Sequence, residues 1–215
     1  MQNITIETLN NGDIEQCRDL CNELMAFQKS KAHIHAEWFD LMNFDTRMKK
    51  SCEEALRHQV IVAKDHGVPI GYIFSTIDPI EPADRNACPD WAVTDEKSLG
   101  FYPEWVSLPQ EIGCLSNLYL RDKYRGSGIG TKLFDKAMEW LESFSGVDLI
   151  FVYISNGNDA ALQFYLNHGF AFSHDVFGGF IQAAYKTRHV NEKPINTPSN
   201  PQNPYSSQHF ASSPA

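Results

Sequence analysis

The chain has 215 residues, of which 42% are hydrophobic and 21% charged, and this suits one globular domain with a core of its own. Its formal net charge of −9 argues against general affinity for nucleic acid, because neutralising phosphates requires clustered Lys and Arg. The same charge is compatible with a cationic small molecule as a partner.

The first half of the chain predicts a strand, helices and a hairpin. Ile4–Leu9 alternates as a short strand does. A helix is expected to run to about Lys29, because one face of it carries Ile14, Cys17, Cys21, Leu24 and Gln28. Ala32–Leu56 follows with a helical composition and many aromatic residues. Two β-rich runs on either side of Gly67, "QVIVAKD" and "VPIGYIFSTI", then predict a β-hairpin.

The segment Asp78–Gln110 has no clear period and contains five prolines. A loop of this length inside a compact domain is usually functional or mobile. A solvated charged loop is the default explanation of its acidic residues, and an acidic lid that attracts a cationic amine is the alternative. These residues are Glu81, Asp84, Asp90, Asp95 and Glu96.

The second half has clearer periodicity. Glu111–Leu120 is typical of a strand, and a helix follows it with Ile129, Leu133, Ala137, Trp140 and Phe144 on one face. Val147–Ile154 is almost wholly apolar, as a strand buried on both faces is. A short helix with Asn156 or Asn158 as its cap and Gly169 as its stop comes next. Phe180–Thr187 predicts a last strand.

A glycine-rich turn, "RGSGIG" at Arg125–Gly130, lies between the strand and the helix of this second half. Its spacing fits neither a P-loop nor a dinucleotide fingerprint. Glycines allow close approach and positive φ, and amides at a helix N-terminus attract anions, so the turn can grip a pyrophosphate without a metal. A tight turn with glycines for steric reasons alone is the alternative.

Two motifs in the right order resemble the GCN5-related N-acetyltransferases (GNAT). Arg125–Gly130 matches that family's R/Q-x-x-G-x-G/A acetyl-CoA motif, and the later helix matches a second motif at Asn158, Ala161, Phe164, Tyr165, Gly169 and Phe170. The element order agrees from Ile4 to Lys186, and the motif agreement is confined to about Leu115–Phe170.

The resemblance implies an α/β fold, a twisted mixed sheet with helices on both faces. The central strands, Glu111–Leu120 and Val147–Ile154, are expected to splay apart where the cosubstrate enters. Residues 1–189 would form the acetyltransferase domain. Residues 190–215, rich in Pro, Ser, Asn and Gln, predict a flexible low-complexity tail.

The same resemblance assigns residues to acetyl-CoA, the implied cosubstrate, with no metal. The pantetheine arm would pair with backbone groups from Leu118 to Leu120. The pyrophosphate would lie on the amides of Arg125, Gly126, Ser127, Gly128, Ile129, Gly130 and Thr131. Asn158 matches a position whose side chain often touches the cosubstrate, and a helix cap explains it equally well.

The chemistry of amine acetylation needs an acid and a base. An amine with a pKa of about 10.4 costs roughly 4–5 kcal/mol to deprotonate at pH 7, so a base helps, directly or through water. A departing thiolate with a pKa of about 8.5 can take a proton from a tyrosine. The resemblance places Tyr165 in this general-acid position, and a core tyrosine is the alternative.

The base is less well defined by the sequence. Some family members of the polyamine type carry an acid on the central strand where this chain has Ser116 and Asn117. Glu111, nearer the strand start, is the candidate base acting through water. A solvated charge at the strand end explains Glu111 equally.

The resemblance therefore implies an N-acetyltransferase that transfers acetyl directly from acetyl-CoA to a primary amine of a small molecule or peptide. A non-catalytic acyl-CoA-binding module on the same fold is one alternative, and an interaction protein with a flexible tail is another. Members of the family often dimerise, so a homodimer is compatible with the sequence. The acceptor site is expected near His33, His35, Glu37, Trp38 and Asp40, with Trp38 and Phe39 as packing residues.

Other features point to a cytoplasmic protein with no membrane partner. No apolar run reaches the roughly 18 residues that a membrane span needs, and the first residues show no secretory signal. The five cysteines form no C-x-x-C pair, so free thiols in a reducing compartment are expected.

Overall fold

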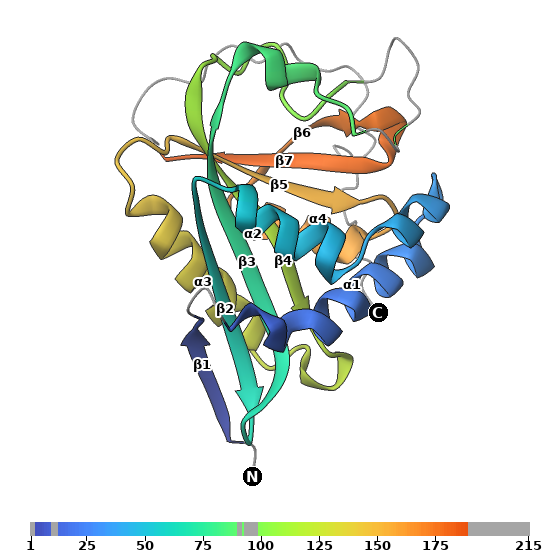
Figure 1. Ribbon diagram of the computed structural model, residues 1–215, viewed down its shortest axis with the longest axis vertical. Coiled ribbons are helices and arrows are strands. Elements are labelled where there is room, and N and C mark those ends of the chain that lie inside the picture. The colour runs from blue at the N-terminus through green and yellow to red at the C-terminus, as the bar shows by residue number, and fades with distance from the viewer. Residues whose placement is uncertain (1–2, 10–12, 90–91, 93–98, 189–215) are drawn as a thin grey trace, which may run out of the picture.

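The computed structural model describes residues 3–9, 13–89, 92 and 99–188. The expected tail at 190–215 lies outside these residues, as do Asp90, Asp95 and Glu96. One mixed sheet of seven strands has the order β1-β2-β3-β4-β5-β7-β6 (Figure 1). The strands are β1 (Ile4–Thr8), β2 (Arg57–Asp65), β3 (Val68–Ile80), β4 (Gln110–Leu120), β5 (Leu149–Ser155), β6 (Ala171–Val176) and β7 (Ile181–Thr187).

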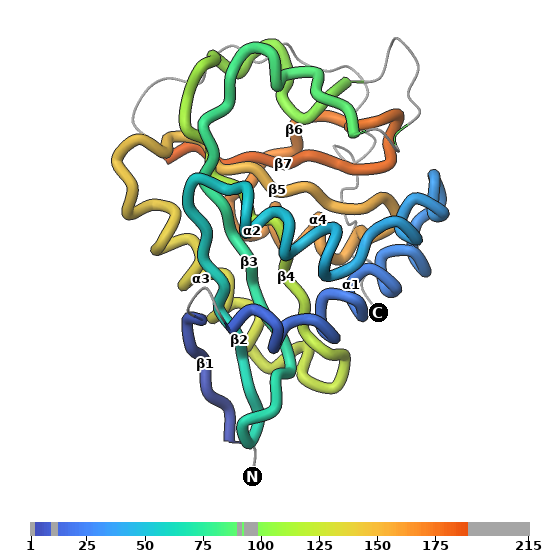
Figure 2. Tube along the Cα trace, viewed as in Figure 1, coloured from blue at the N-terminus to red at the C-terminus, as the bar shows by residue number. Residues whose placement is uncertain are grey.

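Helices connect these strands. The α-helices are α1 (Arg18–Lys31), α2 (Lys50–Glu54), α3 (Ile129–Glu142) and α4 (Asp159–Asn167). The shorter helical turns are η1 (Ile14–Cys17), η2 (Ala36–Leu41), η3 (Phe44–Lys49), η4 (Pro82–Asn86), η5 (Asp122–Tyr124) and η6 (Phe177–Gly179). Helices α1 and α2 cross one face of the sheet and α3 and α4 lie on the other, as the tube in Figure 2 shows.

Each face of the sheet carries its own buried core, which confirms the predicted layers. The core under α1 and η3 includes Leu20, Phe44, Tyr72 and Phe151. The core under α3 and α4 includes Ile73, Leu133, Val152 and Leu162. Successive residues of β5 enter opposite cores, which is the reason that this strand reads as one apolar run.

The hairpin of β2 and β3 forms around a two-residue turn, as predicted. His66 and Gly67 have φ angles of 49° and 79°, so both lie in the left-handed region. A turn with two positive φ values matches the twist of the strands that it joins. Asp65 therefore pairs with Val68 directly across the turn.

Two stretches differ in detail from what their composition suggested, and one strand was not expected. The stretch Ala32–Leu56 is not one helix, because His35 adopts a left-handed φ of 51° and Asn43 starts a new turn by accepting bonds from two amides. Part of Asp78–Gln110 is structured, since β3 continues to Ile80 and η4 follows. Strand β6 has no predicted counterpart, because only three of its six residues are sheltered from solvent.

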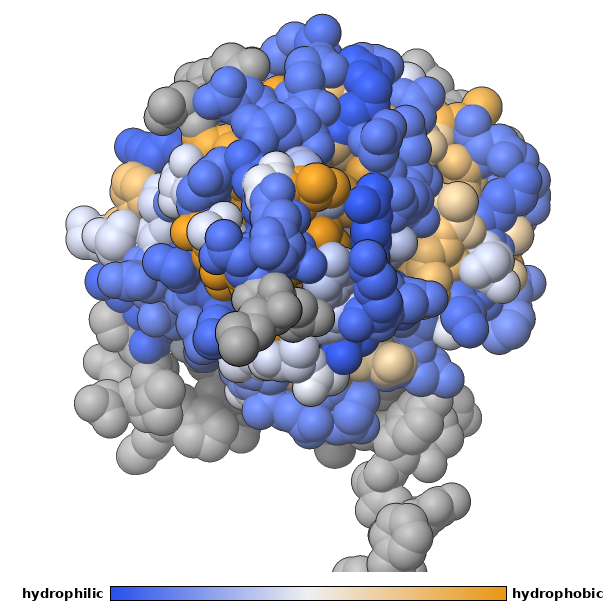
Figure 3. All heavy atoms as spheres, turned by 90° about the horizontal axis from the view of Figure 1, so that it is seen from below, coloured by the Kyte–Doolittle hydropathy of each residue, from blue (hydrophilic) through white to orange (hydrophobic). Residues whose placement is uncertain are grey.

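One face of the surface, seen from below, is mostly hydrophilic, with smaller apolar areas between ridges of polar residues (Figure 3). Among the residues that the structure describes, no helix is both long and apolar enough to cross a bilayer.

Candidate active site

The two central strands separate halfway along the sheet. Parallel pairing of β4 with β5 runs from Ile112 opposite Leu149 to Leu115 opposite Val152 and then stops. Both strands continue, β4 along β3 to Leu120 and β5 along β7 to Ser155. The backbone of β4 after Leu115 therefore has no strand partner on its β5 side. The predicted splay is confirmed, and Leu118 and Leu120 both lie on this open stretch.

A β-bulge marks the point of separation. Phe74 of β3 pairs with Asn117 and Ser75 pairs with Leu115, which leaves Ser116 as an extra residue in β4. A bulge of this kind turns two successive side chains to the same face of a sheet. Ser116 and Asn117 accordingly both line the pocket described below.

The glycine turn lies just beyond the open stretch of β4, at the start of α3. Gly126 and Gly128 have φ angles of 72° and 80°, which favour glycine. A Cβ added at Gly126, Gly128 or Gly130 would meet no atom within 4 Å, so the space above the turn is open. No side chain caps the N-terminus of α3, and its first amides are free to bind an anion.

Arg125 is held against the protein beside this turn. Its Nε donates to the carbonyl of Leu120 at 2.9 Å, and its guanidinium lies over the rings of Phe27 and Tyr119. Its side chain also forms an ion pair with Asp122 at 3.0 Å. The positive charge is thereby fixed near the turn rather than swinging freely in solvent. The backbone amide of Arg125, expected to bind the pyrophosphate, donates to the Asp122 carbonyl at 3.0 Å and so already has a partner within the protein.

Tyr165 projects from α4 into the core on the α3 side, where it packs against Phe134 and Phe170. It is 5% exposed, and its hydroxyl makes no hydrogen bond within the described residues. Burial, reinforced by Cys114 of β4, raises the pKa of Tyr165 above its ordinary value. The phenol therefore stays protonated at neutral pH, the state that a general acid requires.

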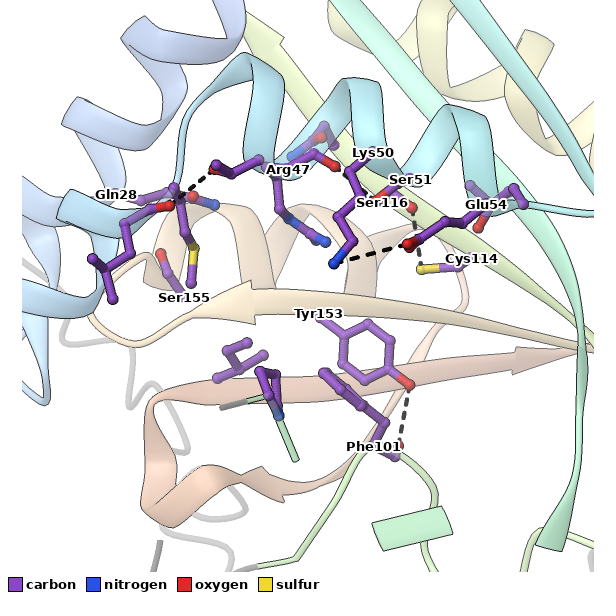
Figure 4. A pocket seen from close by; sticks show the side chains of 18 of the residues that line it. Gln28, Arg47, Lys50, Ser51, Glu54, Phe101, Cys114, Ser116, Tyr153 and Ser155 are labelled. Atoms are coloured by element: carbon purple, nitrogen blue, oxygen red, sulfur yellow. Dashed lines mark hydrogen bonds and ion pairs between the residues drawn. The ribbon is translucent and has the colours of Figure 1, made fainter. Parts of the chain in front are cut away.

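A pocket of about 860 Å³ opens on the other face of the splayed strands. Its walls come from two sides: α1, η2, η3 and α2 form the helical side, and β3, the bulge of β4, the end of β5 and the segments before β4 and β7 form the other. Arg47 and Lys50 project into it from the helical side, while Tyr153 and Phe101 lie across from them (Figure 4). The Tyr153 hydroxyl donates to the Phe101 carbonyl at 3.1 Å.

The floor of this pocket contains polar atoms that lack partners. Asn117 is 5% exposed and Ser155 is 3% exposed, and both line the pocket. Within the described residues, Asn117 Oδ1 and Ser155 Oγ are buried and make no hydrogen bond. Buried polar atoms are nearly always satisfied, so a ligand or water is the natural partner here.

Cys114 is the thiol of the pocket. Burial raises its pKa to about 11, although a hydrogen bond from Ser116 and the charge of Arg47 act in the opposite direction. At neutral pH the side chain is a protonated thiol, which is a poor nucleophile.

Two other predicted residues lie elsewhere. Glu111 does not line the pocket; its Oε2 lies 3.1 Å from Arg57 Nη1 at the start of β4. Asn158 stands at the N-cap position of α4, but its side chain makes no cap hydrogen bond. The expected cap role of its side chain is therefore wrong, and the contact with the cosubstrate remains a prediction.

Asn156 has a role that the sequence did not reveal. Its Oδ1 accepts from the backbone amides of His33 and Ile34, and its Nδ2 donates to the carbonyls of Ile34 and Phe180. The amide thus fastens the end of β5 to the α1–η2 connection and to η6. The expected choice of Asn156 as a cap is wrong, because its side chain is fully used in this clamp.

The region that was expected to hold the acceptor contributes mostly packing. Trp38 and Phe39 are buried and both contact Phe180, which confirms their predicted packing role. His35 stacks on Trp38, and Asp40 forms an ion pair with Lys29 at 2.6 Å. Of this group only Phe39 lines the pocket.

Sequence reasoning also missed the bulge and Arg47. The bulge leaves a readable signal, because two adjacent polar residues, Ser116 and Asn117, interrupt the alternation of β4. Arg47 leaves no such signal in the sequence, since it is one of several charged residues in an apparently helical stretch. For metals, no group of three or more His, Cys, Asp or Glu within the described ranges is arranged as a binding site.

Known proteins resemble this chain in sequence or in fold. The chain is 37% identical over 59 residues to a probable N-acetyltransferase, san, of Drosophila melanogaster, a match that covers 27% of this chain and 29% of that relative. The paia N-acetyltransferase of Thermoplasma acidophilum, solved with coenzyme A, superposes with a TM-score of 0.55 at 16% identity, over 86% of this chain and 99% of that one. NAA60 of Arabidopsis thaliana, solved with a bisubstrate analogue, gives 0.51 at 13% identity, over 85% and 95%.

These structural likenesses confirm the fold. The family described as Acetyltransferase (GNAT) matches residues 18–170, which include α1, the bulge, the glycine turn and Tyr165. Since this match spans well over half of the chain, the protein belongs to the GNAT acetyltransferase family.

Proposed function

We propose that the protein is an acetyl-CoA-dependent N-acetyltransferase that acts on a primary amine of a small molecule or peptide. One observation carries this proposal: the gap between β4 and β5 has an open, uncapped glycine turn near one end and a pocket on one face. Two substrates that enter from these two directions meet at the bulge.

The residues present fit acetyl-CoA, which would supply a thioester acetyl group. The backbone of β4 from Leu118 to Leu120 pairs with β3 on one side and faces no described strand on its β5 side, where it offers strand-like hydrogen bonds to an amide-containing arm. The open amides of Gly126–Thr131, with Arg125 fixed beside them, suit a pyrophosphate. Asn158, whose side chain makes no cap bond, is available to the same ligand.

Direct transfer fits the pocket better than an acyl-enzyme. The pocket's thiol, Cys114, has a pKa raised to about 11 and is a weak nucleophile. In direct transfer the amine nitrogen bonds to the acetyl carbon, the carbon–sulfur bond breaks, and sulfur takes a proton. Tyr165 is the proposed donor of that proton. Burial raises the pKa of Tyr165, so its phenol holds the proton at neutral pH until a thiolate forms.

The amine's own proton has a less direct route. Glu111, the base expected from the sequence, is paired with Arg57 and does not line the pocket, so it would have to act through a chain of water. Ser155 Oγ and Asn117 Oδ1 can hold such a water at the pocket floor. We therefore favour a water relay over direct base catalysis.

A binding module without catalysis is the second candidate. It is favoured by the absence of a carboxylate at the bulge, where Ser116 and Asn117 stand. Melting with and without acetyl-CoA, followed by thiol release against an amine panel, separates the two candidates. Saturation at 100 times the dissociation constant should stabilise the fold by about 2.7 kcal/mol. Stabilisation with thiol release supports the enzyme; stabilisation without release on any amine supports the module.

A further inference from the structure

Arg47 differs from every other arginine in the chain, all of which fall within the described residues. Arg18, Arg57, Arg121 and Arg125 form ion pairs with carboxylates, and Arg85 and Arg188 donate to backbone carbonyls. The guanidinium of Arg47 has neither kind of partner among the residues that the structure describes. Five N–H donors and a full positive charge are left for something else to bind.

The fold directs this charge into the pocket. Arg47 is half-buried on η3, between Phe44 and Met48, which are both 0% exposed in the core. Its side chain projects toward the splayed strands (Figure 4). Burial raises the pKa of Cys114 on β4 and of Cys21 on α1, and the charge of Arg47 opposes both rises, so the guanidinium lies near both thiols.

The carboxylates that share the pocket are engaged with other groups. Asp45 lies 2.6 Å from Arg18, and Asp78 accepts from the amide of Leu56 at 3.1 Å. Glu54 faces Lys50 at 3.8 Å. No carboxylate of the described chain neutralises Arg47, and a half-buried unpaired guanidinium costs stability unless a ligand meets it.

The opposite side of the pocket has complementary chemistry. Asn117 Oδ1 and Ser155 Oγ, at the bulge and at the end of β5, are buried and lack partners. An amine donates to such oxygens. A ligand that spans the pocket would therefore meet acceptors at the strands and a cation at η3.

We infer that the acceptor is a small amino acid, α or ω, whose amine lies at the bulge and whose carboxylate is bound by Arg47. This inference rests on the proposed function and names its substrate class. A planar guanidinium binds a carboxylate through two parallel hydrogen bonds, which gives orientation as well as affinity. Diamines fit less well, because their second ammonium would face a like charge.

Matched acceptor pairs test the inference through thiol release from acetyl-CoA. Alanine, β-alanine and γ-aminobutyrate are each compared with their own neutral amides, and putrescine serves as the diamine. We expect the carboxylates to be preferred in kcat/KM by about 10- to 100-fold, as for a hydrogen-bonded charge pair. The preference should shrink in Arg47→Gln and be partly retained in Arg47→Lys. Lys49→Gln, which removes an equal charge from the same turn outside the pocket, is the control and should keep it.

A binding measurement keeps the inference separate from catalysis. The N-acetyl forms of the same amino acids should raise the melting temperature of the wild-type protein, and Arg47→Gln should lose this shift while its ligand-free melting stays cooperative. Thiol release with no preference for carboxylates, or with a preference for putrescine, would overturn the inference and leave the proposed function standing. A carboxylate-dependent shift without thiol release on any amine would support the Arg47 site and overturn the proposed function.

Discussion

The two halves of the site are built by different means. The half assigned to the cosubstrate is made of backbone, namely the open edge of β4 and the amides at the start of α3. The acceptor half is made of side chains from segments that are distant in sequence, such as Arg47, Asn117 and Ser155. A backbone cradle depends little on side-chain identity, whereas a side-chain pocket can change its ligand through single substitutions. A substitution in one half should therefore affect mainly the binding of the substrate that this half is proposed to hold.

The largest effect is expected at the proposed general acid, which lies in the core under α3 and α4 and does not line the pocket. Tyr165→Phe removes the proposed acid but keeps the ring packed against Phe134 and Phe170. Because the hydroxyl makes no hydrogen bond in the described structure, stability should change little. The value of kcat should fall by about 100-fold or more, the usual contribution of a general acid, with KM for acetyl-CoA nearly unchanged. Steady-state kinetics that show full kcat would remove Tyr165 from the mechanism.

A second substitution, Gly157→Ala, should displace backbone that supports the acceptor half without changing a residue that lines the pocket. Gly157 has a φ of 75°, and a Cβ there would lie 2.1 Å from the carbonyl oxygen of Lys31. Gly67→Ala is the matched control, since its φ is 79° and a Cβ would meet nothing within 4 Å. Gly67→Ala should cost about 1–2 kcal/mol through backbone strain alone.

Gly157→Ala should cost about 1–3 kcal/mol more, because the backbone must also move to relieve the overlap. It displaces the connection that Asn156 fastens, so the acceptor KM should rise more than the acetyl-CoA KM. Urea unfolding and steady-state kinetics measure the two effects. Equal stability losses in the two variants would show that the clamp tolerates the displacement.

The third substitution acts on the cosubstrate half. Gly130→Leu places a side chain in the open space above the glycine turn without requiring a positive φ. The helix should gain up to about 1 kcal/mol, since glycine is a poor helix former. Acetyl-CoA binding should weaken by about tenfold, which corresponds to ~1.4 kcal/mol. Calorimetry measures the binding, and Lys136→Leu on the exposed side of α3 is the control. A stabilised variant with unchanged affinity would contradict the placement of the pyrophosphate.

The smallest effect concerns a histidine behind the acceptor half. His174 is 7% exposed, with Nε2 lying 2.9 Å from the carbonyl oxygen of Gly100, next to the pocket residue Phe101. Burial lowers its pKa, so below the ordinary value of about 6.5 the unfolded chain binds a proton that the folded chain resists. Stability should therefore fall as pH drops from 7 toward 5. The melting temperature of His174→Gln should fall less over this range; an equal fall in both proteins would exclude His174 as the cause.

The conformation of the glycine turn could be predicted from the sequence because the constraints there are local. Gly126 and Gly128 adopt positive φ angles, which glycine tolerates best, and the motif places them between a strand and a helix. The splay also followed from the family resemblance. The turn is encoded within a few neighbouring residues, whereas the splay concerns two strands that are distant in sequence.

The acceptor half could not be predicted in the same way. Arg47 matters because every other arginine finds a partner and it does not, which only the folded chain shows. Asn156 looked like a helix cap, yet tertiary contacts with His33 and Phe180 take up its amide. Glu111 looked available, yet Arg57, on the neighbouring part of the sheet, pairs with it. Contacts between distant parts of the chain, or their absence at Arg47, therefore determine the roles of these three side chains.

Amide hydrogen exchange with and without coenzyme A tests the division of the site most directly. We expect coenzyme A to slow exchange at Leu118–Leu120 and Gly126–Thr131. Exchange at residues 44–54, which form part of the helical wall of the acceptor pocket, should stay unchanged. Slowing confined to residues 44–54, or no slowing at the glycine turn in saturated protein, would contradict the assignment of the backbone cradle to the cosubstrate.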